Sequence, residues 1–120
     1  MQFTLEETVK HHRAFWDEMA QTGIESKRAA RYWKDNDIDP DFIMDQCFAC
    51  QFKKGLDNKN GRASYCEDTC IFDWPGGSCE WIGGFFSLWD DSETIEDRKK
   101  YAALIRDLPL KPKYAKIFGE

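Results

Sequence analysis

All five cysteines of this 120-residue chain lie in its middle third, as two close pairs followed by a single residue. The first pair is C-x2-C and the second is C-x3-C, with fifteen residues between the pairs and eight residues before the last cysteine. They are Cys47, Cys50, Cys66, Cys70 and Cys79. Two thiol pairs across a loop of this length are typical of tetrahedral zinc sites, because thiolates are preferred zinc ligands. The pattern predicts a structural Zn²⁺ that ties the centre of the fold together.

Any four of the five sulfurs would complete an all-thiolate zinc site, and the spacing leaves the choice open. We expect Cys47, Cys50 and Cys70 as ligands, joined by either Cys66 or Cys79. In a C-x2-C turn, backbone N–H groups point at the first sulfur and help to keep it ionised. Cys66 and Cys70 are four residues apart, so both could face one ion from a single helical turn. Such a site supplies on the order of 10 kcal/mol of folding free energy.

Three other states of the cysteines are alternatives to zinc: free structural thiols, a redox-active C-x2-C pair and an iron–sulfur cluster. The redox pair is disfavoured because no βαβ pattern surrounds the motif. Five cysteines cannot all pair within one chain, which argues against a framework of disulfides.

Charge and hydropathy restrict the class of protein. The formal net charge is −5, whereas general nucleic-acid binding needs a strong basic excess. The first 22 residues carry several charges and no apolar run, so no signal peptide is expected. No stretch approaches the roughly 18 consecutive apolar residues of a membrane span. We therefore expect a soluble cytoplasmic protein, a setting in which clustered cysteines are more often metal ligands than disulfides.

The N-terminal region has the clearest helical pattern. Thr4 and Glu7 form a capping-box sequence, and Gly23 supplies a C-terminal stop. Between them, side chains of one face recur every three or four residues, at Leu5, Val9, His12, Trp16 and Met19. The sequence therefore predicts a helix from residue 5 to about residue 22.

Three further helices are predicted: residues 24–35, a short helix opened by Asp39-Pro40 and running to Met44, and a last helix from Ser92 to about Asp107. The inner face of this last helix is expected to consist of Ile95, Ala102, Ile105 and Leu108.

The remaining segments are predicted to be irregular. Residues 53–61 are polar, with glycines at 55 and 61, and are expected to form an exposed loop. Residues 74–78 are expected to form a tight turn that returns Cys79 toward Cys70. The tail 110–120 is either loose or docked across the body. No segment alternates strongly between apolar and polar residues, so the predicted fold is a single mostly α domain over residues 1–120, stapled by a central zinc knuckle, with little or no sheet.

The sequence offers little support for an enzyme. His11 and His12 lie on the first helix, far before the cysteines, and His12 falls on the apolar stripe, which favours a core role. No nucleophile elbow, phosphate loop or dinucleotide-binding glycine pattern is present. We therefore predict no catalytic residue and no small-molecule substrate.

The combination of motifs resembles a group of small cysteine-rich proteins of tailed bacteriophages. The matching segments are residues 12–16, Cys47-Phe48-Ala49-Cys50, Cys66, Cys70, residues 74–79, Leu88-Trp89 and residues 105–109. In that group the second pair is more often C-x2-C followed by proline; here it is C-x3-C followed by Ile71, which weighs against Cys66 as a ligand. The resemblance implies a phage protein that acts in the cytoplasm of the bacterial host and has no agreed activity.

The preferred functional hypothesis is a zinc-stapled module that binds, and inhibits or redirects, a host or host-defence protein. Aromatic residues flanked by charges are typical of interaction hot spots. The candidate contact residues are Trp33 with Arg28 and Arg31, and Trp81, Phe85 and Trp89 beside the acidic run 90–97.

Two alternatives remain open at this point. The first is nucleic-acid binding through Lys53, Lys54, Lys59 and Arg62, with Phe48 or Phe52 as stacking groups. The second is a metal-dependent enzyme, which would need an open coordination position that four cysteines would close.

Overall fold

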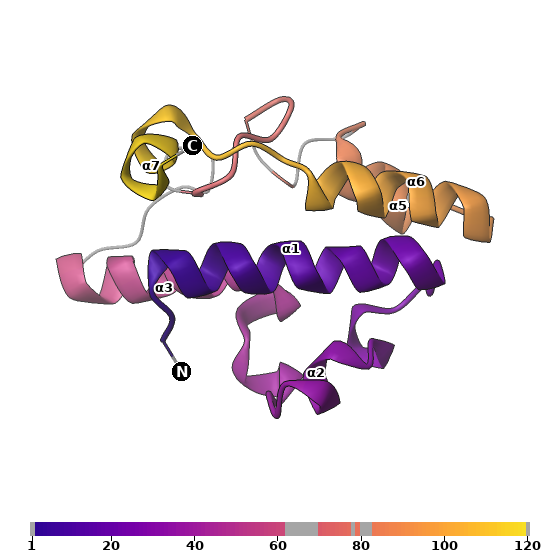
Figure 1. The fold of residues 1–120 in the computed structure, drawn as a ribbon, viewed down its shortest axis with the longest axis horizontal. Helices are drawn as coiled ribbons and strands as arrows, with labels where there is room; N and C mark the ends of the chain where they lie inside the picture. The colour runs from indigo at the N-terminus through magenta and orange to yellow at the C-terminus, as the bar shows by residue number, and fades with distance from the viewer. Residues whose placement is uncertain (1, 62–69, 78, 80–82, 120) are drawn as a thin grey trace.

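The computed structural model describes residues 2–61, 70–77, 79 and 83–119, and within these residues the chain is mostly helical (Figure 1). The mostly α fold is therefore confirmed, and the described residues contain no strand beyond an isolated bridge between Phe72 and Leu110. The α-helices are α1 (Leu5–Thr22), α2 (Tyr32–Asp35), α3 (Phe48–Asn60), α5 (Phe85–Asp90), α6 (Ile95–Arg106) and α7 (Pro112–Phe118). Three short 3₁₀ turns are η1 (Lys27–Ala29), η2 (Pro40–Phe42) and η3 (Met44–Gln46).

Helix α1 begins and ends where the sequence predicts. The Glu7 backbone N–H donates to the Thr4 hydroxyl over 3.1 Å, and the Thr4 N–H donates to the Glu7 carboxylate over 2.9 Å, which completes the capping box. Gly23 ends the helix in the left-handed region, with φ 66°. A Cβ on Gly23 would lie only 2.5 Å from Ile95 Cγ2, so the glycine also permits a close approach to α6.

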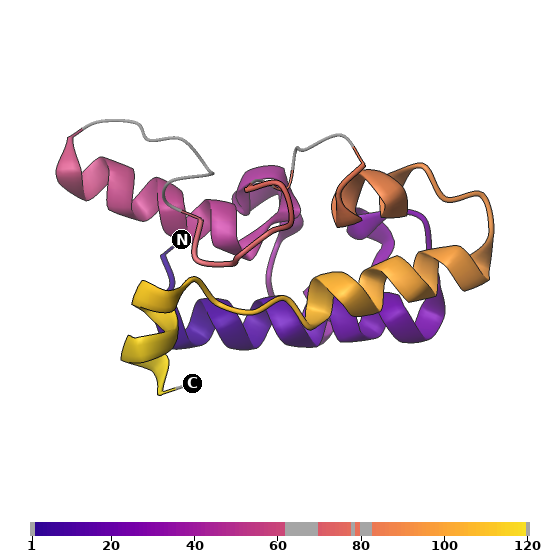
Figure 2. The same ribbon diagram turned by 90° about the horizontal axis from the view of Figure 1, so that it is seen from above.

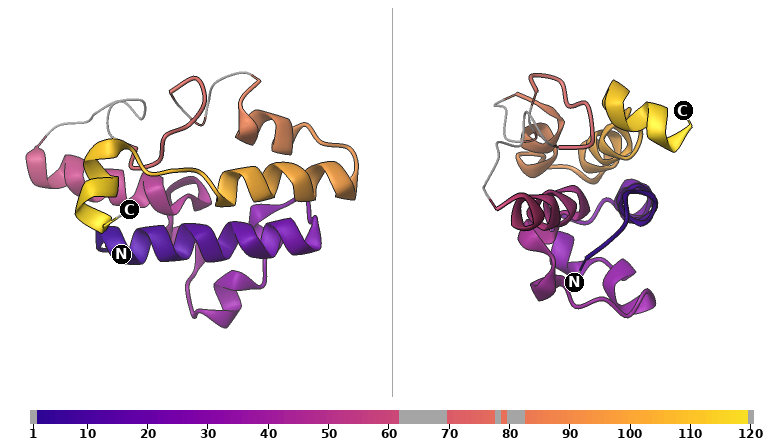
Figure 3. Two further views of the ribbon diagram at one scale, coloured as in Figure 1. Left: turned by 45° about the horizontal axis from the view of Figure 1, so that its top comes forward. Right: turned by 90° about the vertical axis from the view of Figure 1, so that its left-hand side faces the viewer.

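Helices α3 and α6 pack against two neighbouring sides of α1, and the segment 24–46 covers a third side (Figure 3). Helix α6 runs antiparallel to α1, with α5 packed against it (Figure 2). Most side chains of the predicted stripe on α1 are buried: Val9, His12, Trp16 and Met19. One cluster of rings joins α1 to two of these sides, since Phe15 of α1 lies 5.1 Å from Trp33 and 6.2 Å from Phe48 between ring centroids. The core is therefore built around α1.

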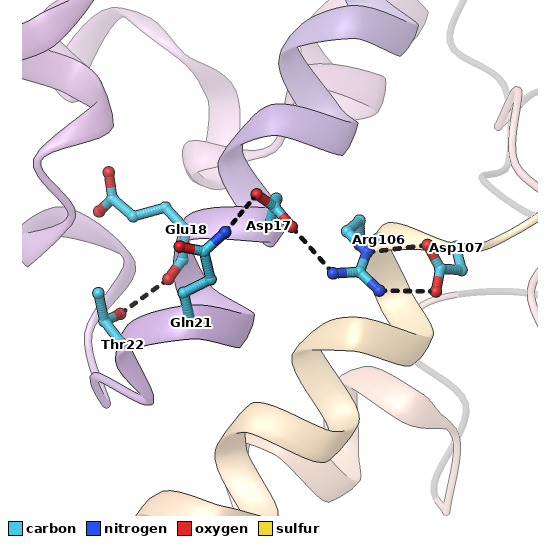
Figure 4. Close-up of polar contacts among 6 residues, drawn as sticks. All are labelled: Asp17, Glu18, Gln21, Thr22, Arg106 and Asp107. Atoms are coloured by element: carbon cyan, nitrogen blue, oxygen red, sulfur yellow. Dashed lines mark hydrogen bonds and ion pairs between the residues drawn. The ribbon is translucent and has the colours of Figure 1, made fainter.

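Polar contacts hold α6 to the solvent side of α1 (Figure 4). Arg106 donates to the Asp17 carboxylate over 2.9 Å and makes two hydrogen bonds to Asp107, of 2.8 and 2.9 Å. Gln21 donates to the other oxygen of Asp17 over 2.8 Å. Hydrogen bonds from Arg106 lower the pKa of Asp107. Such exposed pairs generally contribute less than about 1 kcal/mol to the free energy of unfolding. Their main effect is therefore to set the register of α6 on α1.

The predicted helix over residues 24–35 is wrong in its middle. The chain forms η1, passes through extended backbone at Ala30 (ψ 137°) and only then forms α2. The Trp33 indole N–H donates to the Lys27 carbonyl over 2.7 Å, a contact that folds the segment back on itself and buries Trp33. Burial of the large rings therefore outweighs helix propensity here.

The segment after Asp39 starts as predicted but does not form one helix to Met44. The Asp39 carboxylate accepts from the Asp41 N–H over 2.9 Å and Pro40 opens η2. Ile43 then adopts extended backbone and separates η2 from η3. Its side chain is fully buried, which explains the break.

The predicted exposed loop at residues 53–61 is also wrong, because residues 48–60 form α3. An ion pair of 2.8 Å between Lys53 and Asp57, one turn apart, supports the helix. Gly55 lies inside the helix, where an added Cβ would meet the Gln2 side chain at 3.0 Å. Gly61 does act as a stop signal, with φ 77° at the C-terminus of α3.

Helix α6 begins two residues later than predicted, because Thr94 rather than Ser92 is its N-cap. The Thr94 hydroxyl accepts from the Asp97 N–H over 3.1 Å, whereas the Ser92 hydroxyl donates to the Leu88 carbonyl at the end of α5. Ile95 is exposed, contrary to expectation, while Ala102, Ile105 and Leu108 are buried as predicted.

Of the two alternatives for the tail, the structure shows the docked one. Leu110 is buried and residues 112–118 form α7, with Tyr114 and Phe118 against the core. The Lys111 N–H donates to the Ile71 carbonyl over 2.9 Å, and the Asp73 N–H donates to the Pro109 carbonyl over 2.8 Å. The tail therefore holds the segment 71–73 in place.

The capping box of α1 gives a stability prediction. Thr4→Ala removes the side-chain acceptor of the Glu7 N–H and is expected to lower the free energy of unfolding by about 1 kcal/mol in urea denaturation. Thr22→Ala is the matched control, because its hydroxyl only donates to the Glu18 carbonyl at the other end of the helix. An equal loss in both variants would contradict the capping argument.

Candidate metal centre

Cys47 is the N-cap of α3, and its sulfur accepts the Cys50 backbone N–H over 3.2 Å. This is the contact that the C-x2-C spacing predicts, and the structure confirms it. Both cysteines are half-buried, and they approach each other because one helical turn carries them.

Cys79 reaches the same place from a separate part of the chain. Hydrogen bonds with Cys47 and with Cys79 raise the pKa of the Cys50 thiol above its ordinary range. The Cys50 hydrogen bond lowers the pKa of Cys47 to about 7, with a smaller contribution from the positive charge of Lys27. Cys50 thus lies near thiols from two segments, Cys47 of its own helical turn and Cys79.

The turn that precedes Cys79 is the predicted one as far as the structure describes it. The Gly77 N–H donates to the Trp74 carbonyl over 2.9 Å, and Gly76 and Gly77 have φ of 84° and 93°. Ser78 lies outside the described residues. Positive φ at two consecutive positions suits glycine alone at low cost, which explains the Gly-Gly sequence.

Cys70 is the buried neighbour of this group. Burial, with smaller contributions from the nearby Cys47 and Cys79, raises the pKa of Cys70 to about 11, which places all three within electrostatic reach. The Trp74 indole N–H acts in the opposite direction and lowers the pKa of Cys70. The Trp74 Nε1 atom is buried and has no hydrogen bond of normal geometry to any described residue, although it lies near the Cys70 thiol.

The donor set fits zinc in its chemistry, but the described residues do not form a closed cage. Nowhere in residues 2–61, 70–77, 79 and 83–119 are three or more His, Cys, Asp or Glu side chains grouped tightly enough to hold a metal ion. The four described cysteines are free of disulfides. Cys66 lies outside the described residues, so the predicted helical turn from Cys66 to Cys70 does as well. N–H donors from Cys50 and Trp74 are the kind of neighbours that support metal-bound thiolates. The zinc ion stays a prediction.

A cavity of about 350 Å³ adjoins the thiols. Its charged lining residues are Lys27, Asp45 and Lys53, and its aromatic lining residues are His12, Phe15, Trp16, Phe48, Trp74 and Phe86. Lys27 donates to the Asp45 carbonyl and lies 4.9 Å above the Phe86 ring. Asp45 and Gln46 have φ of 53° and 50°, an uncommon backbone for residues other than glycine, directly before Cys47.

The predicted contact residues for a partner divide into buried and exposed groups. Trp33 and Trp89 are only 3% exposed and belong to the core, so their rings are not available to a partner. Phe85 is half-buried, and Trp81 lies outside the described residues. Arg28 and Arg31 are exposed, and Arg28 pairs with Asp41.

Two exposed apolar side chains that the sequence did not predict lie in the segment of Asp41, the ion-pair partner of Arg28. Phe42 is 65% and Met44 43% exposed, on either side of the buried Ile43. Residues 42–44 are all apolar, so the sequence carries no alternation that separates the two exposed side chains from the buried Ile43.

The residues expected for nucleic-acid binding do not form the predicted loop. Phe48 is buried among other rings and cannot stack on a base, and Lys53 pairs with Asp57. Lys54 and Lys59 are exposed on α3, Phe52 is half-buried, and Arg62 lies outside the described residues.

The histidines have structural partners. His12 is buried, its Nε2 lies 2.9 Å from the Ile105 carbonyl oxygen, and its ring stacks on Phe72 with centroids 3.8 Å apart. The predicted core role of His12 is confirmed. His11 lies beside the Tyr32 hydroxyl and stacks on Phe48.

Comparisons with known protein families, with curated proteins and with solved structures find no match to this chain. Of the helices that the structure describes, none combines the length and apolar character that a membrane crossing requires.

The burial of His12 gives a prediction about pH. Burial lowers the pKa of His12 from 6.5 to about 4. Between these values the unfolded chain binds a proton that the folded chain does not, so stability is lost as the pH falls through this window, by about 3 kcal/mol in total. We expect His12→Gln to remove this dependence, measured as the difference between variant and native protein in urea denaturation from pH 7 to pH 4.

The difference between the two proteins cancels any contribution from thiols or carboxylates that titrate in both. His11→Gln is the control, because His11 is only half-buried and should account for a smaller part of the slope. Parallel pH profiles for native protein and His12→Gln would contradict the assignment.

Proposed function

We propose that this chain is a small zinc-binding interaction protein that binds a protein of a bacterial host, or of its defence systems, and inhibits or redirects it. The observation that carries the metal part is the approach of Cys79 to the Cys47–Cys50 turn, next to the buried Cys70. Of the two candidates for the fourth ligand, the hydrogen bond between Cys50 and Cys79 favours Cys79 over Cys66.

A bound zinc ion would supply a cross-link between the N-terminus of α3 and the segment 70–79. Two N–H groups of the chain lie close to the sulfurs that would bind the ion. The Cys50 N–H stabilises negative charge on the Cys47 sulfur, and the buried Trp74 indole N–H, which has no hydrogen-bond partner of its own among the described residues, lies near Cys70. Four thiolates would close the coordination sphere, which supports a structural ion and not a catalytic one.

The segment 27–46 supports the interaction part of the proposal. It presents Phe42 and Met44 to solvent beside the exposed Arg28–Asp41 pair. Large apolar side chains flanked by charges of both signs suit a protein surface better than a polyanion, and so does the net charge of −5. The contact surface that we propose therefore consists of Arg28, Arg31, Asp41, Phe42 and Met44.

Zinc binding is tested by metal analysis of the reduced protein together with two matched variants. We expect one zinc per chain, retained in Cys66→Ser and weakened more than about a hundredfold in Cys79→Ser, because loss of a ligand exceeds the ~10–100-fold effect of a neighbouring group. Competition with a chromogenic chelator measures the affinity. The opposite order of the two variants would exchange the fourth ligand, and no zinc in any preparation would refute the metal site.

Partner binding is tested by capture from a bacterial lysate with the tagged chain, followed by calorimetry with the captured protein. The double variant Phe42→Ala, Met44→Ala is expected to weaken binding at least tenfold, about 1.4 kcal/mol. Ile117→Ala is the control, because Ile117 is equally exposed but lies on α7.

No stoichiometric protein at micromolar concentration would contradict the proposal. Copurification of nucleic acid, with an affinity that falls steeply with salt, would favour the alternative through Lys54 and Lys59.

A further inference from the structure

The thiols at the start of α3 are arranged for a second kind of chemistry. Cys47 and Cys50 lie in one helical turn, and the Cys50 N–H donates to the Cys47 sulfur over 3.2 Å. Neither is in a disulfide. A disulfide requires its two Cβ atoms to lie about 3.5–4.5 Å apart, and a C-x2-C turn at a helix N-terminus is a common way to bring two cysteines into that range.

Solvent reaches this pair through the cavity. Cys47, Cys50 and Cys79 all line the space of about 350 Å³, whereas Cys70 is buried and does not line it. The volume is within the range of small-molecule sites, so a small disulfide can approach the two sulfurs without unfolding of the helix.

We propose that Cys47 and Cys50 are a dithiol–disulfide pair that is oxidised by low-molecular-weight disulfides such as glutathione disulfide. The expectation from the sequence was against a redox pair because no βαβ unit surrounds the motif. The structure supplies instead the local feature that matters, two contacting thiols at the N-terminus of a thirteen-residue helix that line an open cavity.

The exchange balances as two successive displacements. The Cys47 sulfur, having released its proton to solvent, attacks one sulfur of the small disulfide, and a mixed disulfide forms as the first small thiolate leaves. The deprotonated Cys50 sulfur then attacks Cys47 Sγ, and the second small thiolate leaves. The two protein thiols lose two electrons and two protons, and the small disulfide takes up both to become two thiols.

Cys47 is the attacking residue because it is the N-cap of α3 and its sulfur accepts the Cys50 backbone N–H. Cys50 is therefore already next to the sulfur that it must attack in the second step. Cys79 contacts the same residue, but it comes from a different segment and shares no helical turn with it.

This inference rests on the proposed function in one respect only. A sulfur in a disulfide no longer carries the negative charge with which it binds a metal ion, so oxidation of the pair and zinc binding would exclude each other. The proposed redox pair would thus release a structural zinc ion under oxidising conditions.

The test uses the full chain in a series of glutathione and glutathione disulfide mixtures, with and without a metal chelator. Free thiols are alkylated, the protein is digested with trypsin, and the peptides are identified by mass. Trypsin leaves Cys47 and Cys50 together in residues 35–53, and Cys66, Cys70 and Cys79 together in residues 63–98. As the mixture becomes oxidising, we expect the peptide 35–53 to appear without alkyl groups and with a mass two hydrogens below that of the reduced, unalkylated peptide.

Two variants make the result specific. Cys79→Ser should leave the disulfide within residues 35–53 unchanged. Cys50→Ser should stop the reaction after the first step, so that glutathione accumulates on Cys47. A cross-link between residues 35–53 and 63–98 would overturn the assignment, and so would full alkylation of residues 35–53 in mixtures that oxidise a control dithiol protein.

Metal analysis of the same samples separates this inference from the proposed function. Zinc in the reduced protein, lost in proportion to the disulfide, supports both. A disulfide within residues 35–53 in a protein that never contains zinc would refute the metal site and leave the redox pair standing. Zinc without that disulfide would refute the redox pair alone.

Discussion

The burial of α1 on three sides is the constraint on which the rest of the structure depends. Helices α3 and α6 and the segment 24–46 all use α1 as their common support, and Phe15 contacts rings from two of these three directions. A chain of this size has a small core, although it buries well over half of its unfolded surface, so a single central helix with large aromatic neighbours is an efficient way to form that core. The position of α3 on α1 in turn determines where Cys47 and Cys50 lie.

The sequence predicts those parts of the fold whose signals are local. The capping box of Thr4 and Glu7 and the stop at Gly23 each depend on a few neighbouring residues, and each is present in the structure. The N–H contact to the Cys47 sulfur belongs to the same class, because the C-x2-C spacing alone specifies it.

Where distant residues decide, the local signals fail. A glycine in a polar segment usually indicates a turn, but Gly55 lies inside α3, opposite Gln2. Burial of Trp33 and Ile43 breaks two segments that have helical periodicity. The approach of Cys79 to Cys50 joins two segments far apart in the chain, so the spacing could suggest it but not choose between Cys66 and Cys79.

The docking of the C-terminal tail has a consequence for synthesis of the protein. Ile71 and Asp73 are hydrogen-bonded to Lys111 and Pro109, residues that are made well after them. On the ribosome, α1 and α3 are complete long before these partners emerge, whereas the segment that joins Cys70 to Cys79 still lacks its support. The segment that carries Cys70 therefore gains this support only after residues 109–111 have been made. The growing chain passes through a stage in which α1 and α3 are formed and Cys47 and Cys50 do not yet have Cys70 and Cys79 beside them.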